Sequence, residues 1–253
     1  MIVFKTIQFD TFSEGYSIIA LNRPEKRNAV SSLMAEELRE AIKQARELEI
    51  KFLVITGSGD KMFCAGGDLQ DLHGELTQID AFHELYKMKE VLYDIVSFPV
   101  PTVCLLNGDA VGGGCEIATA CDFRIAREAT KFGFVQTKLG ITPGWGGGAL
   151  LYEKVHPSFA YTWLIEAEKY DASFLMDKGW IHRMVSTEIF EDQGVLSPYI
   201  SKSLAQMEIL DRQYKQKVGV LGLSALMDDE VRNCAKLWDS EEHVKAVSQF
   251  LNK

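Results

Sequence analysis

The chain has 253 residues, of which 47% are hydrophobic and 25% charged, a composition typical of globular proteins that excludes a disordered tail. Its 36 acidic and 27 basic residues give a formal net charge of −9 at pH 7. The sequence has no stripe of basic residues of the kind that binds nucleic acid. No apolar run is long enough to cross a bilayer, and the first residues do not resemble a signal peptide. We therefore expect a cytoplasmic protein with no membrane or nucleic-acid partner.

Cysteine and histidine show no spacing typical of metal ligands. The cysteines are odd in number and form no C-x-x-C pair, and the five histidines form no cluster. We expect the cysteines to be reduced and buried, and we expect no metal site. The cysteines are Cys64, Cys104, Cys115, Cys121 and Cys234.

Predicted strands and helices alternate through the first half of the chain. The strands are short and apolar, and they lie at residues 2–9, 16–21, 52–56, 102–106 and 122–126. The helices carry apolar residues at helical spacing, and they lie at residues 32–45, 79–97 and from 112 onward. Ser31 or Ser32 can cap the first helix. This alternation favours an α/β fold whose strands are buried on both faces.

Strand patterns become scarce after about residue 145. Predicted helices take their place at residues 149–164, 172–178, 198–217, 223–238 and 241–251. We therefore divide the chain into a strand–helix core, residues 1–195, and a helical C-terminal region, residues 196–253.

Two segments share the order strand, glycine-containing loop, helix start. The loop at residues 65–68 follows the strand at 52–56, and the loop at residues 107–114 follows the strand at 102–106. Glycine lets backbone N–H groups approach a ligand closely, and at a helix start these groups have no internal partner. Two such loops brought together could form an oxyanion hole. Tight turns without a ligand are the alternative for either loop alone.

Glu116 follows the triple glycine of the second loop by two residues, on the first turn of the predicted helix. A carboxylate there is stabilised by the helix dipole, which is a purely structural explanation. As a functional alternative, it reaches over the substrate as a base or to orient water.

The segments that carry these features resemble the motifs of the crotonase (enoyl-CoA hydratase/isomerase) superfamily. The matching stretches run in order along the chain, as Leu21–Ala29, Phe63–Leu69, Asn107–Asp122, Leu139–Gly147 and Gly179–Val185. The resemblance implies a spiral of ββα units with a helical C-terminal region, assembled as trimers or dimers of trimers. It also implies an acyl-CoA thioester as substrate, with no cofactor other than the coenzyme A that the substrate carries.

The same resemblance implies roles for particular residues. The backbone N–H groups of Gly67 and Gly113 would hold the thioester oxygen and stabilise an enolate. The carbonyl groups of Cys64 and Ala65 would lie near the CoA adenine. A basic patch near the CoA phosphates would consist of Arg23, Lys26 and Arg27, which otherwise belong to a solvated loop.

The family resemblance also implies further substrate contacts, in the first glycine loop and in the acyl pocket. The loop contacts are Asp68 and Leu69. The walls of the acyl pocket would be Leu72, Leu139, Ile141 and Trp145, each of which could equally be part of the core.

One position departs from the family pattern. Hydratases of the family use a second glutamate twenty residues after the first, and this chain has Gln136 there. An amide cannot give or take a proton near neutral pH, so ordinary hydration of a 2-enoyl-CoA should be impaired. Gln136 could still position a water molecule or a substrate carboxylate.

Several reactions use the same enolate and remain open. They are weakened hydration, double-bond isomerisation with Glu116 alone, and decarboxylation of a malonyl-type CoA. The stretches 120–124 and 134–147 show some resemblance to ethylmalonyl-CoA decarboxylase-like members, which also lack the second glutamate. Binding of acyl-CoA without turnover is a further alternative, which the presence of Glu116 disfavours.

Overall fold

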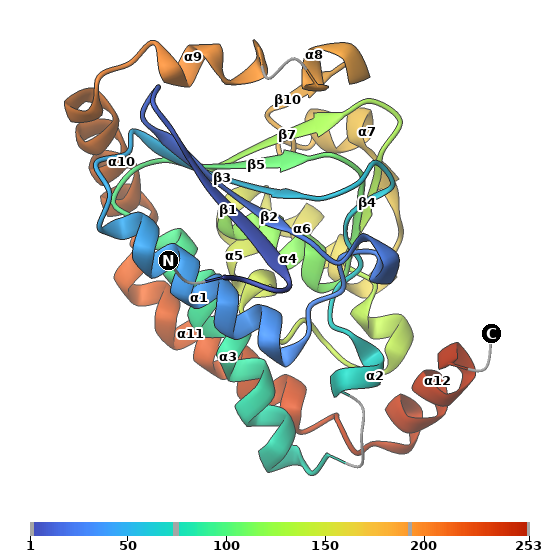
Figure 1. The fold of residues 1–253 in the computed structure, drawn as a ribbon. Coiled ribbons are helices and arrows are strands. Elements are labelled where there is room, and N and C mark those ends of the chain that lie inside the picture. The colour runs from blue at the N-terminus through green and yellow to red at the C-terminus, as the bar shows by residue number, and fades with distance from the viewer. Residues whose placement is uncertain (1–2, 73–75, 192–193, 252–253) are drawn as a thin grey trace.

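The larger of two sheets forms the centre of the fold (Figure 1). The structure is a computed structural model that describes residues 3–72, 76–191 and 194–251. The six strands run in the order β1-β2-β3-β5-β7-β10, antiparallel between β1 and β2 and parallel elsewhere. They are β1 (Ile7–Phe12), β2 (Tyr16–Leu21), β3 (Phe52–Gly57), β5 (Thr102–Leu106), β7 (Phe123–Arg127) and β10 (Arg183–Val185). The strands predicted at 16–21, 52–56, 102–106 and 122–126 are confirmed, whereas the first strand, predicted at 2–9, spans Ile7–Phe12.

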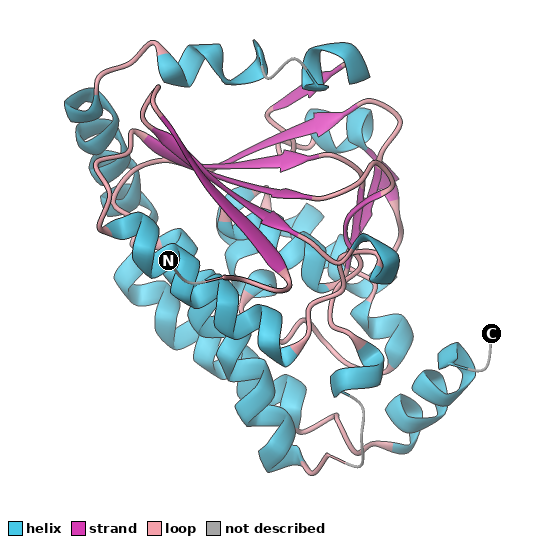
Figure 2. Cartoon of the chain, in the orientation of Figure 1, coloured by secondary structure: helices cyan, strands magenta, loops and turns pink. Residues whose placement is uncertain are grey.

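A second sheet of four very short strands stands beside the first (Figure 2). Its order is β4-β6-β8-β9, where β4, β6 and β8 are parallel and β9 is antiparallel to β8. The strands are β4 (Met62–Cys64), β6 (Asp109–Val111), β8 (Lys131–Gly133) and β9 (Tyr170–Asp171). The sequence did not predict them, because two or three residues are too few for a strand periodicity.

The two sheets are connected in a repeating way that confirms the predicted spiral. Three times, a strand of the large sheet leads directly to a strand of the small sheet: β3 to β4, β5 to β6 and β7 to β8. Helices follow, as α2 (Leu69–Leu72) with α3 (Gln78–Val96), and then α4 (Gly113–Ala120). After β8 comes a 3-10 turn at Gln136–Leu139. Each glycine loop of the sequence therefore lies where a short strand meets a helix.

Side-chain caps fix the two long helices that cover one face of the large sheet. The helix α1 (Ser32–Arg46) is capped by Ser31, whose hydroxyl accepts a hydrogen bond from Met34 N at 3.2 Å. Thr77 and Asp80 form a capping box at the start of α3. The two helices pack against each other beneath the sheet. Both were predicted to within a few residues.

Two predicted helices are each divided in the structure. The segment 149–164 forms α5 (Gly147–Lys154) and α6 (Pro157–Glu166), because Pro157 starts a new helix that His156 caps. The segment 198–217 forms α9 (Ser197–Ile200) and α10 (Leu204–Val218). The remaining helices are α7 (Ala172–Asp177), α8 (Thr187–Glu191), α11 (Val220–Ala235) and α12 (Glu241–Leu251).

The large sheet is covered on both faces, as predicted. Along β3, Leu53 and Ile55 belong to the main core between the sheet and its helices, whereas Phe52 and Val54 belong to a smaller apolar cluster on the opposite face. All five cysteines are buried. Among the described residues, no helix combines the length and the hydropathy that a membrane span requires.

Candidate active site

The structure brings the two predicted glycine loops into direct contact. The first loop follows β4, and the triple glycine of the second loop follows β6, a short strand within the predicted loop 107–114; β4 and β6 are neighbours in the small sheet. A Cβ atom on Gly66 would lie 3.1 Å from Gly113 N, and one on Gly114 would lie 2.3 Å from Cys64 O. Gly112 has a φ of 55°, which also favours glycine. The backbones can therefore approach so closely only without side chains.

The N–H groups of Gly67 and Gly113 are placed at this contact. Gly67 lies in an isolated bridge to Val30, in which Val30 N donates to Gly66 O and Asp68 N donates to Val30 O, both at 2.8 Å. Gly113 is the first residue of α4, where N–H groups have no partner inside the helix. Within the described part of the chain, neither N–H group donates a hydrogen bond to a protein atom.

Glu116 is buried at the start of α4 and is held at both carboxylate oxygens. Its side chain is only 2% exposed. Its Oε2 accepts hydrogen bonds from Trp145 N and Gly147 N, each at 3.0 Å, and its Oε1 accepts one from Gln136 Nε2 at 2.9 Å. Burial raises the pKa of Glu116, while these hydrogen bonds partly oppose the shift. The carboxyl group can therefore hold a proton more readily than an exposed glutamate.

Gln136 has one satisfied and one unsatisfied amide atom. Because a carboxylate only accepts hydrogen bonds, the contact with Glu116 fixes the amide with its nitrogen toward the acid. The opposite atom, Oε1, is buried and has no hydrogen-bond partner among the described residues. A Cβ on Gly112 would lie 3.8 Å from the Gln136 amide carbon, so this side chain lies over the second glycine loop. The structure thus unites Glu116, Gln136 and Gly113.

Trp145 lies directly over the same loop. A Cβ on Gly113 would be 2.1 Å from Cζ3 of the indole, and the tryptophan is 4% exposed. A cavity of about 10 Å³ remains beside the indole. The apolar side chains around it include Val30, Leu85, Met88 and Trp238.

A further glycine-rich segment, residues 144–148, lies outside the two loops and has a structural role. Its N–H groups bind two carboxylates, one from Glu116 and one from Glu230 on α11. Burial and the nearby charge of Glu116 raise the pKa of Glu230. No motif surrounds Glu230, so only the three-dimensional structure identifies it.

The predicted CoA-binding cations lie in different environments. Arg23 forms an ion pair with Asp68 at 2.9 Å and donates a hydrogen bond to Ala29 O at 2.7 Å. Lys26 is exposed and donates to Gln70 Oε1 at 3.0 Å. Arg27 is exposed in a left-handed backbone conformation. Lys26 and Arg27 are therefore the more accessible of the three basic residues.

The remaining predicted contacts border the two loops. Cys64 and Ala65 form the first loop's junction with β4, and Leu69 begins α2. The carbonyl oxygen of Leu139 accepts a hydrogen bond from His243 Nδ1 of α12 at 2.6 Å. Ile141 is buried in the main core. The side chain of Leu72 lies outside the described residues.

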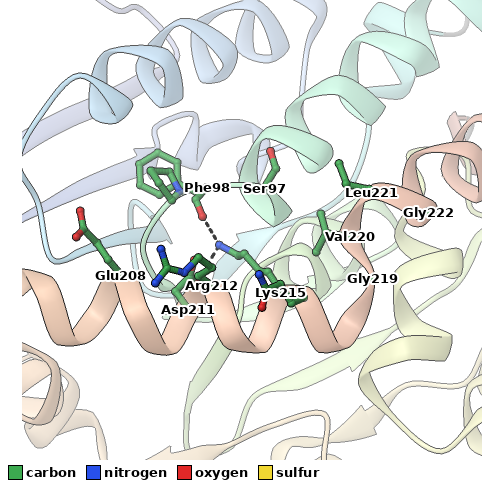
Figure 3. A pocket seen from close by; sticks show the side chains of 12 residues that line it. Ser97, Phe98, Glu208, Asp211, Arg212, Lys215, Gly219, Val220, Leu221 and Gly222 are labelled. Atoms are coloured by element: carbon green, nitrogen blue, oxygen red, sulfur yellow. Dashed lines mark hydrogen bonds and ion pairs between the residues drawn. The ribbon is translucent and has the colours of Figure 1, made fainter.

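A much larger hollow, of about 780 Å³, lies elsewhere on the molecule (Figure 3). It is bounded by the end of α3, by α10 and by the junction between α10 and α11. Lys215 projects into it, donating a hydrogen bond to Phe98 O and pairing with Asp211 at 2.9 Å. None of the candidate-site residues lines this hollow.

The family model described as enoyl-CoA hydratase/isomerase matches residues 11–253, nearly the whole chain. The chain belongs to the enoyl-CoA hydratase/isomerase family. This crotonase-superfamily membership makes the protein an enzyme of the lyase or isomerase type, and it agrees with the spiral fold and the paired glycine loops.

Relatives of this family member have hydratase names. The chain is 35% identical over 176 residues to a crotonyl-CoA hydratase of Syntrophomonas wolfei, covering 69% of this chain and 67% of that protein. It is 27% identical over 242 residues to a short-chain-enoyl-CoA hydratase of Clostridium acetobutylicum, covering 94% and 91%. An enoyl-CoA hydratase/isomerase structure from Xanthobacter autotrophicus has a TM-score of 0.90 at 22% identity, over 99% and 94% of the two chains. At that identity the structural likeness supports the fold alone.

Proposed function

We propose that this family member converts a short-chain enoyl-CoA by double-bond isomerisation. The thioester oxygen is held by Gly67 and Gly113, and Glu116 is the only residue that transfers a proton. The observation that carries the proposal is the hydrogen bond from the Gln136 amide to the Glu116 carboxylate. This hydrogen bond pairs Glu116, which can transfer a proton, with Gln136, which cannot.

The two free N–H groups support stabilisation of an enolate. When a proton leaves the carbon next to the thioester, negative charge accumulates on the thioester oxygen. Donors fixed in advance at that position stabilise the charge, and each is typically worth about 3–4 kcal/mol of barrier. The close backbone contact between the loops keeps both donors in place without reorganisation.

Glu116 supplies the proton chemistry of the proposed reaction. As a carboxylate it removes a proton from C2 of a 3-enoyl-CoA, and the electrons form an extended enolate. The protonated Glu116 then returns the proton to C4, which leaves the 2-enoyl-CoA and restores the carboxylate. The raised pKa of Glu116 favours both steps, since it brings proton uptake and release closer to neutral pH.

The names of two relatives, a crotonyl-CoA hydratase and a short-chain-enoyl-CoA hydratase, support a short acyl group. The cavity beside the indole of Trp145 measures about 10 Å³, the room of about one water molecule, so binding of any acyl group there requires the indole to move. Lys26 and Arg27 are available for the CoA phosphates. The coenzyme A is part of the substrate, and the proposal needs no other cofactor.

Decarboxylation of a malonyl-type CoA is the second candidate, and the unpartnered Oε1 of Gln136 favours it. When Glu116 is protonated, its O–H group can donate to Oε1 after the amide turns over. The Nε2 group would then point into the site and could donate to a substrate carboxylate. In that reaction the departing CO₂ takes the place of proton removal.

A substrate panel tests the proposal. The protein is incubated separately with a 3-enoyl-CoA, crotonyl-CoA and methylmalonyl- or ethylmalonyl-CoA, and the products are followed by mass and chromatography. We expect the protein to isomerise the 3-enoyl-CoA much faster than it hydrates crotonyl-CoA. In Glu116→Gln the isomerisation rate should fall about a hundredfold or more. Turnover of the malonyl-type substrate alone would select decarboxylation, and tight CoA binding without any turnover would select a binding protein.

A further inference from the structure

Two carboxylates share the N-terminal turn of α5. Trp145 N and Gly147 N donate to Oε2 of Glu116, each at 3.0 Å. The N–H groups between and after them bind Glu230: Gly146 N at 2.7 Å, Gly148 N at 3.4 Å and Ala149 N at 2.6 Å. From Trp145 to Gly148, consecutive donors therefore alternate between an acid from α4 and an acid from α11, and Ala149 N adds a further bond to the α11 acid.

This turn is enclosed by the helices that supply the two acids. A Cβ on Gly147 would lie 2.3 Å from Cβ of Glu116, and a Cβ on Gly146 would lie 2.6 Å from the Met227 side chain. A Cβ on Gly148 would lie 2.8 Å from Oε2 of Glu230. The turn thus has no room for side chains, and its position depends on both carboxylates.

We propose that Glu230 is a positioning residue for Glu116, because it fixes from α11 the turn whose alternate N–H groups hold the Glu116 carboxylate. The inference rests on the proposed function of Glu116 as the proton carrier. Glu230 touches neither the glycine loops nor Gln136 through any hydrogen bond of the described residues. Its effect therefore reaches the reaction only through the turn and through its charge.

The electrostatic consequence is a pair of coupled acids. The helix N-terminus and its N–H groups stabilise negative charge, but the first charge formed raises the pKa of the second acid. Other titratable groups that face this charge are Tyr152 on α5, Cys234 on α11 and Cys115 on α4; burial raises the pKa of each, and the nearby glutamate charge adds to the shift. Lys89 of α3 is engaged with Asp228 instead.

The first test is a titration of the carboxyl groups in the substrate-free protein. Infrared spectra are recorded across the pH range, and spectra of Glu116→Gln and Glu230→Gln variants assign the bands by subtraction. We expect the wild-type pair to lose its protons in two separate steps. In Glu230→Gln a single step should remain, at a lower pH than the upper wild-type step. Wild-type steps that coincide with the steps of the two single variants, or an unmoved Glu116 step in Glu230→Gln, would overturn the coupling.

The second test uses kinetics with the isomerisation substrate. Glu230→Gln should lower kcat about tenfold or more and leave KM nearly unchanged, since the turn is misplaced while the CoA site is intact. Glu230→Asp keeps a carboxyl group and should recover part of the loss. Asp229→Asn removes a charge from the exposed neighbouring position of α11 and serves as the matched control.

A double variant separates positioning from general destabilisation. In the Glu116→Gln background, Glu230→Gln should slow the residual reaction less than about twofold, because the group through which it acts is already absent. An equal loss in both backgrounds would refute the positioning role. If the wild-type protein converts none of the substrates, the proposed function fails, whereas the infrared titration still decides the coupling of the two acids.

Discussion

At the scale of single residues, the proposed chemistry rests on the pairing of Glu116 with Gln136. A second glutamate would provide a second proton carrier, but the amide provides only a donor at 2.9 Å and a buried, unpartnered oxygen. The acid is also held by two backbone donors, so its orientation does not depend on Gln136 alone. This fixed orientation supports the proposed role of Glu116 as the single proton carrier.

Replacing Gln136 by glutamate should add hydratase activity. The new carboxyl group would lie beside Oε1 of Glu116, and the two acids would share a proton, so that one can activate water while the other protonates carbon. We expect the rate of crotonyl-CoA hydration, measured as the loss of enoyl absorbance, to rise about tenfold or more. Gln136→Leu is the control and should show no gain. A folded Gln136→Glu protein without a gain would mean that the acyl pocket excludes productive hydration.

The contact between Gly113 and Trp145 predicts a non-additive pair of substitutions. Gly113→Ala would place a methyl group 2.1 Å from the indole and should cost about 1–3 kcal/mol of unfolding free energy. In the Trp145→Ala background the indole is absent, so the same change should cost much less. Urea unfolding of the four proteins measures the coupling. Equal costs in both backgrounds would show that the indole is not the obstructing group.

At the scale of elements, the sequence predicted the helices and the central strands better than the parts around the site. Helical periodicity over 78–96 and short apolar runs such as 102–106 are strong local patterns. The small sheet was missed because its strands are too short for periodicity. The acid Glu230 was missed because its role depends on a contact between distant segments. The glycine loops were recognised, but only the structure shows that they touch.

In the loop between β2 and α1, we expect one basic residue to contribute to folding stability and two others to contribute to CoA binding. Arg23 is engaged with Asp68, whereas Lys26 and Arg27 are exposed. We expect Arg23→Ala to lower the melting temperature. Lys26→Ala with Arg27→Ala should raise KM for acyl-CoA several-fold without a change in melting temperature, and the effect should shrink at high salt. Unchanged KM in the double variant at low salt would remove the CoA-phosphate role.

At the scale of the whole molecule, the C-terminal helices are part of the site's framework. The helix α11 packs against α3 and α5 and supplies Glu230, and α12 supplies His243, which binds Leu139 O next to the Gln136 turn. The region from residue 196 onward therefore packs on the strand–helix core. Whether it also joins subunits remains a prediction from the family resemblance.

We expect the buried Asp211 of α10 to make the folding stability depend on pH. Burial raises its pKa to about 6 despite the ion pair with Lys215, whereas an unfolded aspartate titrates near 3.9. The folded state therefore binds the extra proton between about pH 4 and 6, so stability falls as pH rises through this window, by about 3 kcal/mol at most. Asp211→Asn should remove this decline. Glu208→Gln, an exposed change on the same helix, should retain it. Chemical unfolding at several pH values measures both.

The most direct measurement of the central claim is hydrogen exchange at the acyl carbon next to the thioester. A short saturated acyl-CoA is incubated with the protein in D₂O, and deuterium incorporation at C2 is followed by mass. We predict that the wild type incorporates deuterium at C2. The exchange rate should fall about a hundredfold or more in Glu116→Gln and only modestly in Gln136→Leu. Exchange that persists undiminished in Glu116→Gln would contradict the assignment of Glu116 as the single proton carrier at an enolate.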